Sequence, residues 1–285
     1  MKKCLAALLA ALMILLCGCA RKSAAEAPAS VLATTAPVAE LASALLEGTD
    51  IVVTRLISGS VSCLHDYTLS VSEMKTASQA KVALLSGFGL EEFMRDALSA
   101  CETVVEVGTE VEALDSDEGP DPHIWLAPEN MAVMAHAAAA SLSELYPHWA
   151  SVIASNEAAC CEELSRLQDY GETQLQALSC RKLITFHDGF SYFAQAFGLE
   201  IAASMELEPG SEPSARDLET IIALIRQEQI PAIFVEANGT RDAAEVVAAE
   251  TGVKIYTLSM AMDASEGSYP EILRQNIDTV KEALG

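Results

Sequence analysis

Three of the five histidines in this 285-residue chain stand in loop segments beside an acidic residue. They occur as His65-Asp66, Asp121-Pro122-His123 and His187-Asp188. Neutral imidazole is a favoured ligand of Zn²⁺, and a neighbouring carboxylate commonly holds the second ring nitrogen of a metal-bound histidine. We therefore predict that the three imidazoles converge on one metal ion. A single loop histidine is more often a surface group, so this prediction depends on the three together.

The segment around His123 reads Gly119-Pro120-Asp121-Pro122-His123-Ile124-Trp125-Leu126-Ala127-Pro128-Glu129-Asn130. Its first two prolines exclude a helix and a central strand, so we expect a rigid extended turn that presents His123 and Trp125. Pro128 and Glu129 then begin an Ala-rich helix, because proline suits the first helical turn and the helix dipole favours an acid there.

A fourth metal ligand is expected, because three neutral imidazoles leave the charge of Zn²⁺ uncompensated. Water or a carboxylate can take this position. Glu236, at the end of a predicted strand, and Asp263, beyond the last predicted strand, are the candidate carboxylates. Cys63, two residues before His65, is a less favoured soft ligand. His136 and His148 lie on predicted helices and are interpreted as surface or packing residues.

Buried strands alternate with helices along most of the chain. The predicted strands cover residues 31–35, 51–57, 81–85, 103–107, 183–186, 201–205, 232–235 and 254–258. The predicted helices include 37–46, a segment up to 78, a segment up to 99, 129–145, 148–178, a segment up to 197, a segment up to 227, 242–251 and 269–284. Residues 108–121 are acidic and without apolar periodicity, so a solvated loop is expected.

This alternation predicts an α/β fold in which parallel sheets are covered by helices. We expect an N-terminal lobe over residues 31–147, a linking helix over 148–178 and a C-terminal lobe over 179–285. A helix of that length would measure about 45 Å. Ligands of such sheets bind beyond the carboxyl ends of the strands, where the three histidines emerge.

Residues 1–18 have the features of a signal peptide, with Lys2 and Lys3 before an apolar run from Leu5 to Leu16. That run is shorter than the ~20 residues that span a bilayer. The sequence Leu16-Cys17-Gly18-Cys19 is similar to a lipoprotein box, which implies cleavage before Cys19 and its acylation. Residues 19–30 would form a flexible tether. A plain secretory signal is the alternative.

The chain is strongly acidic, with a formal net charge of −24. This charge excludes nucleic acid as a partner and suits an extracytoplasmic protein with a solvated surface. Apart from the three cysteines of the leader and the lipoprotein box, five remain, and they show neither a disulfide framework nor paired CxxC units.

The chain resembles the metal-binding lipoproteins and periplasmic proteins that deliver zinc or manganese to ABC importers, the cluster A-I family that includes ZnuA-type zinc-uptake proteins. The resemblance covers about residues 31–284 and rests on five motifs: His65-Asp66-Tyr67, Gly87-Phe88-Gly89-Leu90-Glu91, residues 121–130, residues 186–193 and Glu212-Pro213-Ser214-Ala215. It implies two lobes joined by a rigid helix, with one metal ion between them.

The resemblance places the metal ligands at His65, His123 and His187. In manganese-binding relatives the third position is typically glutamate, so His187 indicates zinc. Two features depart from the family pattern: Ser259 stands where an acidic residue is usual after the last strand, and a histidine-rich loop before the Asp-Pro-His motif is lacking.

The resemblance implies a monomeric, lipid-anchored protein outside the cell that captures Zn²⁺ and hands it to an ABC permease, and that is not an enzyme. Manganese or iron is the alternative cargo. A zinc hydrolase is the rival of another class, because three histidines and a water also describe catalytic zinc. No HExxH motif supports that rival.

Overall fold

The computed structural model describes residues 30–57, 64, 67–116, 119–205, 213–237 and 241–285. The predicted signal peptide, Cys19, Cys63 and the His65-Asp66 pair lie outside the described residues. Of the three predicted histidine ligands, His123 and His187 lie within the described residues.

The first half of the chain forms a four-stranded parallel sheet in the order β2-β1-β3-β4. Its strands are β1 (Ser30–Ala33), β2 (Val52–Arg55), β3 (Val82–Leu85) and β4 (Thr103–Glu106). Strand β3 is buried along its whole length, as expected for a strand covered on both faces. The described strands of this half thus confirm the predicted alternation, with each strand slightly shorter than its apolar run.

The second half forms another four-stranded parallel sheet, in the order β10-β9-β7-β8. Its strands are β7 (Lys182–Thr185), β8 (Glu200–Ser204), β9 (Ala232–Glu236) and β10 (Lys254–Leu258). Thr185 pairs with Phe234 and Leu258 with Glu236, so the carboxyl ends of β7, β9 and β10 meet at one edge. The chain continues from that edge into His187 and Ser259.

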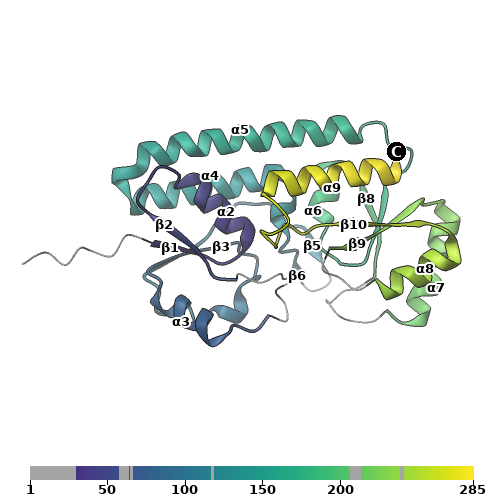
Figure 1. Ribbon diagram of the computed structural model, residues 1–285, viewed down its shortest axis with the longest axis horizontal. Coiled ribbons are helices and arrows are strands. Elements are labelled where there is room, and N and C mark those ends of the chain that lie inside the picture. Colours follow the sequence, from purple (N-terminus) through teal and green to yellow (C-terminus); the bar gives the residue numbers. More distant parts are fainter. Residues whose placement is uncertain (1–29, 58–63, 65–66, 117–118, 206–212, 238–240) are drawn as a thin grey trace, which may run out of the picture.

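Helices cover both sheets (Figure 1). They are α2 (Ala36–Leu45), α3 (Val71–Gln79), α4 (Pro128–Leu145), α6 (Ser191–Ala196), α7 (Ala215–Glu228), α8 (Asp242–Thr251) and α9 (Tyr269–Leu284). Capping boxes form at α3, between Ser70 and Glu73, and at α7, between Ser214 and Asp217. In each box, a serine hydroxyl and an acidic side chain satisfy backbone N–H groups at the start of the helix.

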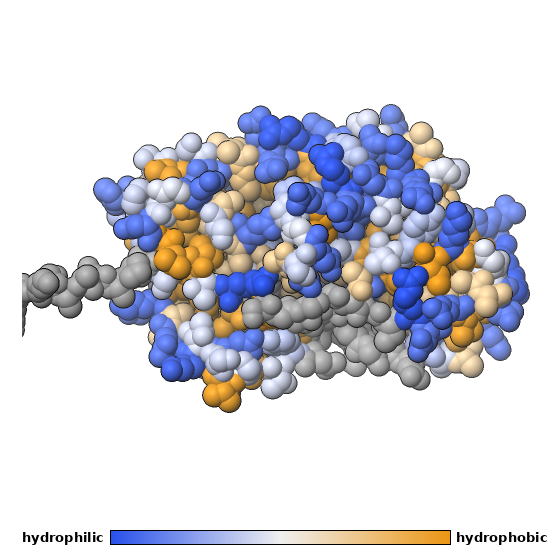
Figure 2. Space-filling view, viewed as in Figure 1, coloured by the Kyte–Doolittle hydropathy of each residue, from blue (hydrophilic) through white to orange (hydrophobic). Residues whose placement is uncertain are grey.

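The long helix α5 (Ala150–Leu175) has 26 residues and is preceded by the short 3-10 helix η3 (Pro147–Trp149). The prediction of a single helix over 148–178 was therefore right in kind and too long. At 1.5 Å per residue, α5 measures about 39 Å. Figure 1 shows α5 passing over both sheets, and it packs against α2, α4 and α9. Hydrophilic residues cover its outer side (Figure 2).

The predicted helix up to residue 99 is wrong. Only the 3-10 helix η1 (Glu92–Met94) forms there, and tight turns continue to residue 100. The carboxylate of Glu91 turns inward and accepts hydrogen bonds from the backbone N–H groups of Ser86 and Gly87 and from the Thr34 hydroxyl. These tertiary bonds pull the start of the segment onto the ends of β1 and β3, and its backbone bonds are mostly of the i to i+3 type.

The predicted solvated loop over residues 108–121 contains a small antiparallel hairpin. Its strands are β5 (Asp115–Ser116) and β6 (Gly119–Pro120). Gly119 has φ of 123°, a backbone conformation that favours glycine. The backbone N–H of Asp121 then donates to the Leu114 carbonyl at 2.7 Å. The hairpin thus fixes the entry to the His123 segment, which the acidic composition of the loop did not reveal.

The main apolar core is continuous between the two halves of the molecule. One cluster joins Leu32 and Leu84 from the first sheet to Phe193, Phe234 and Leu273 from the second half. Trp125 and Tyr192 are among the largest fully buried side chains. A smaller cluster packs α7 and α8 against the other face of the second sheet. Within the described residues, no helix is both long and apolar enough to cross a membrane.

Candidate metal centre

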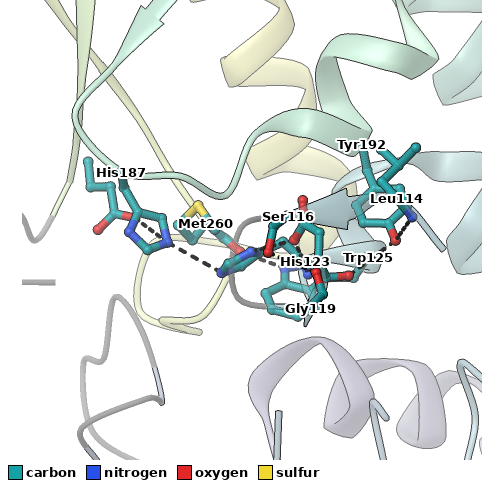
Figure 3. Close-up of polar contacts among 10 residues, drawn as sticks. Leu114, Ser116, Gly119, His123, Trp125, His187, Tyr192 and Met260 are labelled. Carbon is teal, nitrogen blue, oxygen red and sulfur yellow. Dashed lines mark hydrogen bonds and ion pairs between the residues drawn. The ribbon is translucent and has the colours of Figure 1, made fainter. Parts of the chain in front are cut away.

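His123 and His187 approach each other through their Nε2 atoms, which are 3.3 Å apart (Figure 3). Two nitrogens bound to one tetrahedral Zn²⁺ at about 2.0–2.1 Å lie about 3.3–3.4 Å from each other. Both side chains are buried, with exposed fractions of 3% and 4%. This separation, which is also within hydrogen-bonding distance, matches that of two ligands of one zinc ion.

Asp121 fixes the orientation of the His123 ring. Its Oδ1 accepts a hydrogen bond from the backbone N–H of His123 at 2.9 Å and lies 2.8 Å from His123 Nδ1. This contact occupies Nδ1, so that Nε2 faces His187. A carboxylate in this position holds the tautomer of a metal-binding histidine and increases its basicity. The Asp-Pro-His spacing, which suggested this contact, does bring the two side chains together.

Glu236 is a second carboxylate in contact with the histidine pair. It is the last residue of β9, is 7% exposed, and places Oε1 3.6 Å from His187 Nε2. The position follows from the sheet, because β9 lies next to β7 and both strands end at the same edge. A carboxylate here supplies negative charge on the side of His187 that faces β9.

Asp263 and Ser259 both bond within the loop between β10 and α9. Asp263 Oδ1 accepts a hydrogen bond from the backbone N–H of Ser265 at 2.8 Å. The Ser259 hydroxyl donates to Glu266 Oε2 and accepts from the backbone N–H of Ala261. The structure thus brings Glu236 to His187, and Asp263 Oδ1 takes part in the turn that follows it.

The residues on either side of His65-Asp66 in the sequence are described. Leu64 is fully buried, and the Tyr67 hydroxyl donates to Glu73 Oε1 at 2.7 Å. In the part of the chain that the structure describes, no complete group of three or more His, Cys, Asp or Glu side chains forms a metal centre.

Trp125 ties the His123 segment to the second half of the chain. Its indole Nε1–H donates to the Met260 carbonyl at 2.7 Å, and its own carbonyl accepts the Tyr269 hydroxyl at 2.6 Å. Tyr269 is buried, and this burial raises its pKa well above the ordinary value. One hydrogen bond donated by the Trp125 indole and one accepted by its carbonyl therefore hold Trp125 against the loop and helix that follow β10. Trp125 is two residues from His123.

Tyr192 supplies a further connection between the two histidine segments. It lies on α6, just after His187, and its hydroxyl donates to the Asp121 carbonyl at 3.1 Å. The same oxygen accepts the backbone N–H of Leu114 at 2.9 Å. Sequence reasoning did not identify Tyr192, Tyr269 or Met260 as part of the site. The available signal was that buried Tyr and Trp usually direct their polar end to a partner.

The two-lobed α/β fold, with buried imidazoles meeting beyond the strand ends, is that of a metal-binding protein. Residues 31–283 match the family described as zinc-uptake complex component A, periplasmic, and the chain belongs to this family. The family resemblance and the fold class expected from the sequence are thereby confirmed. Because this is a family of uptake components and not of enzymes, the hydrolase alternative is set aside.

The chain is similar both to proteins described as zinc-binding and to proteins described as manganese-binding. The zinc-binding protein TroA of Treponema pallidum is 28% identical over 283 residues, covering 93% of this chain and 91% of that protein. The manganese-binding lipoprotein MntA of Bacillus subtilis is 27% identical over 291 residues, covering 94% and 95%. A crystal structure of ZnuA superimposes with a TM-score of 0.82 at 26% identity, covering 90% of this chain and 99% of that one.

Proposed function

We propose that this protein captures Zn²⁺ outside the cell and delivers it to the permease of an ABC importer. The observation that carries the proposal is the 3.3 Å separation between the Nε2 atoms of His123 and His187. This is the spacing of two nitrogens on one tetrahedral zinc ion. In this reading the ion is cargo and is released after transfer.

The proposed ligands are His65, His123, His187 and Glu236. His65 is included because of its His-Asp-Tyr motif. Glu236 is included because its Oε1 lies 3.6 Å from His187 Nε2. One carboxylate and three neutral imidazoles would complete a four-coordinate site with net charge +1 around Zn²⁺. Asp263, whose Oδ1 accepts a hydrogen bond from the Ser265 backbone N–H, is the alternative carboxylate.

Zinc is preferred over manganese because two buried imidazoles meet at the site. Imidazole suits Zn²⁺, whereas carboxylate, carbonyl and water oxygens suit Mn²⁺. The names of the relatives support either metal, since TroA is described as zinc-binding and MntA as manganese-binding. Manganese or iron therefore remains the alternative cargo in the proposal.

The proposed setting is the outer face of the cell membrane, where lipid on Cys19 would hold a monomer beside the permease. The relatives called lipoproteins support this anchor. A tether of about 11 residues after Cys19, rich in Ala and Ser, would let the folded body turn toward the permease.

Calorimetric titration of the purified chain with Zn²⁺ tests the proposal. We expect one bound ion per chain, and a loss of affinity of about 100-fold or more in His65→Ala, His123→Ala and His187→Ala. His136→Ala is the matched control, because this imidazole is exposed on α4 and contacts Glu157. Undiminished one-to-one binding in all three site variants would remove the case for the proposed function.

A further inference from the structure

Met260 reaches the histidine pair from the loop after β10. A Cβ atom added at Gly189 would lie 2.6 Å from Met260 Cε, 2.7 Å from His187 Cδ2 and 2.9 Å from His187 Nε2. The methyl end of Met260 and the imidazole edge of His187 therefore crowd the same point above Gly189. Figure 3 shows Met260 beside the contact that joins the His187 and His123 rings.

The backbone of Met260 is fixed in this position. Its carbonyl accepts the Trp125 indole N–H at 2.7 Å, and its side chain belongs to the main apolar core, with 4% exposed. The next residue, Ala261, has φ of 57° and donates its backbone N–H to the Ser259 hydroxyl at 3.0 Å. Both bonds are made by the Met260–Ala261 peptide, and they hold the backbone from which the thioether extends toward His187.

We propose that Met260 is a specificity-determining residue, whose apolar side chain closes one side of the metal position and limits the ion to four ligands. The proposal rests on the zinc-capture function proposed above. Zn²⁺ is stable with four tetrahedral ligands, whereas Mn²⁺ prefers octahedral oxygen coordination that includes water. A methyl-tipped side chain offers no oxygen ligand, so it disfavours Mn²⁺ more than Zn²⁺.

A role for Met260 in core packing alone leads to a different expectation. If the side chain only filled space, its truncation would lower the free energy of unfolding and leave the ratio of zinc to manganese affinity unchanged. The distinguishing measurement is therefore a ratio of two affinities in the same variant, together with the coordination number of the bound ion.

Met260→Ala removes the methyl-tipped end of the side chain. Met260→Gln keeps a side chain of similar length and adds an amide oxygen. We expect Mn²⁺ affinity, measured against a chelator, to rise about tenfold in both variants while Zn²⁺ affinity changes less than about threefold. Co²⁺ serves as a spectroscopic probe: the intense visible absorption of a four-coordinate ion should weaken as water or the amide joins it. Met134→Ala is the control, because Met134 is fully buried on α4.

The failure of this inference can be told apart from the failure of the proposed function. One-to-one zinc binding with an unchanged manganese ratio and Co²⁺ spectrum in both Met260 variants would overturn the specificity role alone. Absence of both Zn²⁺ and Co²⁺ binding in the unmodified chain would overturn the metal-capture function and the specificity role with it. Met260→Gln preserves side-chain volume, so the test does not depend on the folding of Met260→Ala.

Discussion

The hydroxyl of Tyr269, the first residue of α9, donates to the backbone carbonyl of Trp125, 144 positions earlier in the chain, at 2.6 Å. This bond joins the C-terminal helix to the segment that carries His123. The precision with which His123 faces His187 therefore depends on a residue that contributes no metal ligand.

Tyr269→Phe removes this bond and retains the buried ring. We expect a loss of about 1–3 kcal/mol in the free energy of unfolding, because a buried carbonyl loses a donor. We also expect a weaker zinc affinity with unchanged stoichiometry. Urea denaturation and zinc titration measure the two effects. Tyr256→Phe is the control, since that hydroxyl makes only a 3.4 Å contact with Glu282 at the surface. Equal behaviour of the two variants would contradict the prediction.

Asp121→Asn tests the carboxylate that orients His123. The amide keeps the shape of the side chain and removes its charge, so the imidazole loses the partner that fixes Nδ1. Loss of such an outer partner typically lowers metal affinity by about 10–100-fold. Competition with a zinc chelator measures the change, and Asp115→Asn on the exposed hairpin strand β5 is the control. Wild-type affinity in Asp121→Asn would show that the ring is positioned by other contacts.

Glu236→Gln and Asp263→Asn together identify the carboxylate ligand. Because Glu236 Oε1 is 3.6 Å from His187 Nε2, we expect its neutral variant to bind Zn²⁺ about tenfold or more weakly. Asp263→Asn should bind as tightly as the unmodified chain. The reverse order of affinities in the same chelator competition would assign the ligand to Asp263.

Glu40 gives the stability of the protein a pH dependence. Burial raises the pKa of its carboxyl above the ordinary value of 4.5, the Tyr269 N–H bond opposes this, and the charges of Glu163 and Glu271 add to the increase. A folded pKa above the unfolded one means that this contribution to stability is fully present below the unfolded pKa. It is lost as the pH rises through the folded pKa.

Glu40→Gln keeps an acceptor for the Tyr269 N–H, which Glu40 binds at 2.8 Å, and removes the titration. We expect the unfolding free energy of the variant to improve relative to the unmodified chain as the pH rises from about 4 to about 7. Urea denaturation of both proteins at several pH values measures the difference. A difference that is constant over this range would refute the assignment to Glu40.

The sequence predicts most of the fold because strands and helices here depend on local patterns. The apolar runs of β3 and β9 form strands where expected, and serine caps begin α3 and α7. The helix after Glu91 was mispredicted because its outcome depends on a tertiary contact, the burial of the Glu91 carboxylate on Ser86, Gly87 and Thr34. Helical propensity does not contain that information.

In the candidate site too, some residues could be predicted from local sequence and others depend on tertiary contacts. His123 and His187 could be selected from their acidic neighbours and strand-end positions, and the structure brings them together. The Trp125 bonds to Met260 and Tyr269 could not be predicted, because they join residues more than 130 positions apart through loops without a regular pattern. Trp, Met and Tyr are also common in apolar cores, so residue type alone does not mark these three as part of a site.

The unbroken apolar core between the two sheets has a consequence for how the molecule melts. Because Trp125 from the first half shares one apolar core with Tyr192 and Phe193 from the second, neither half retains a complete interior once the other has lost its structure. Heating should therefore produce one cooperative transition, and occupancy of a single ion at the sheet edge should slow amide exchange in strands far from it on both sides.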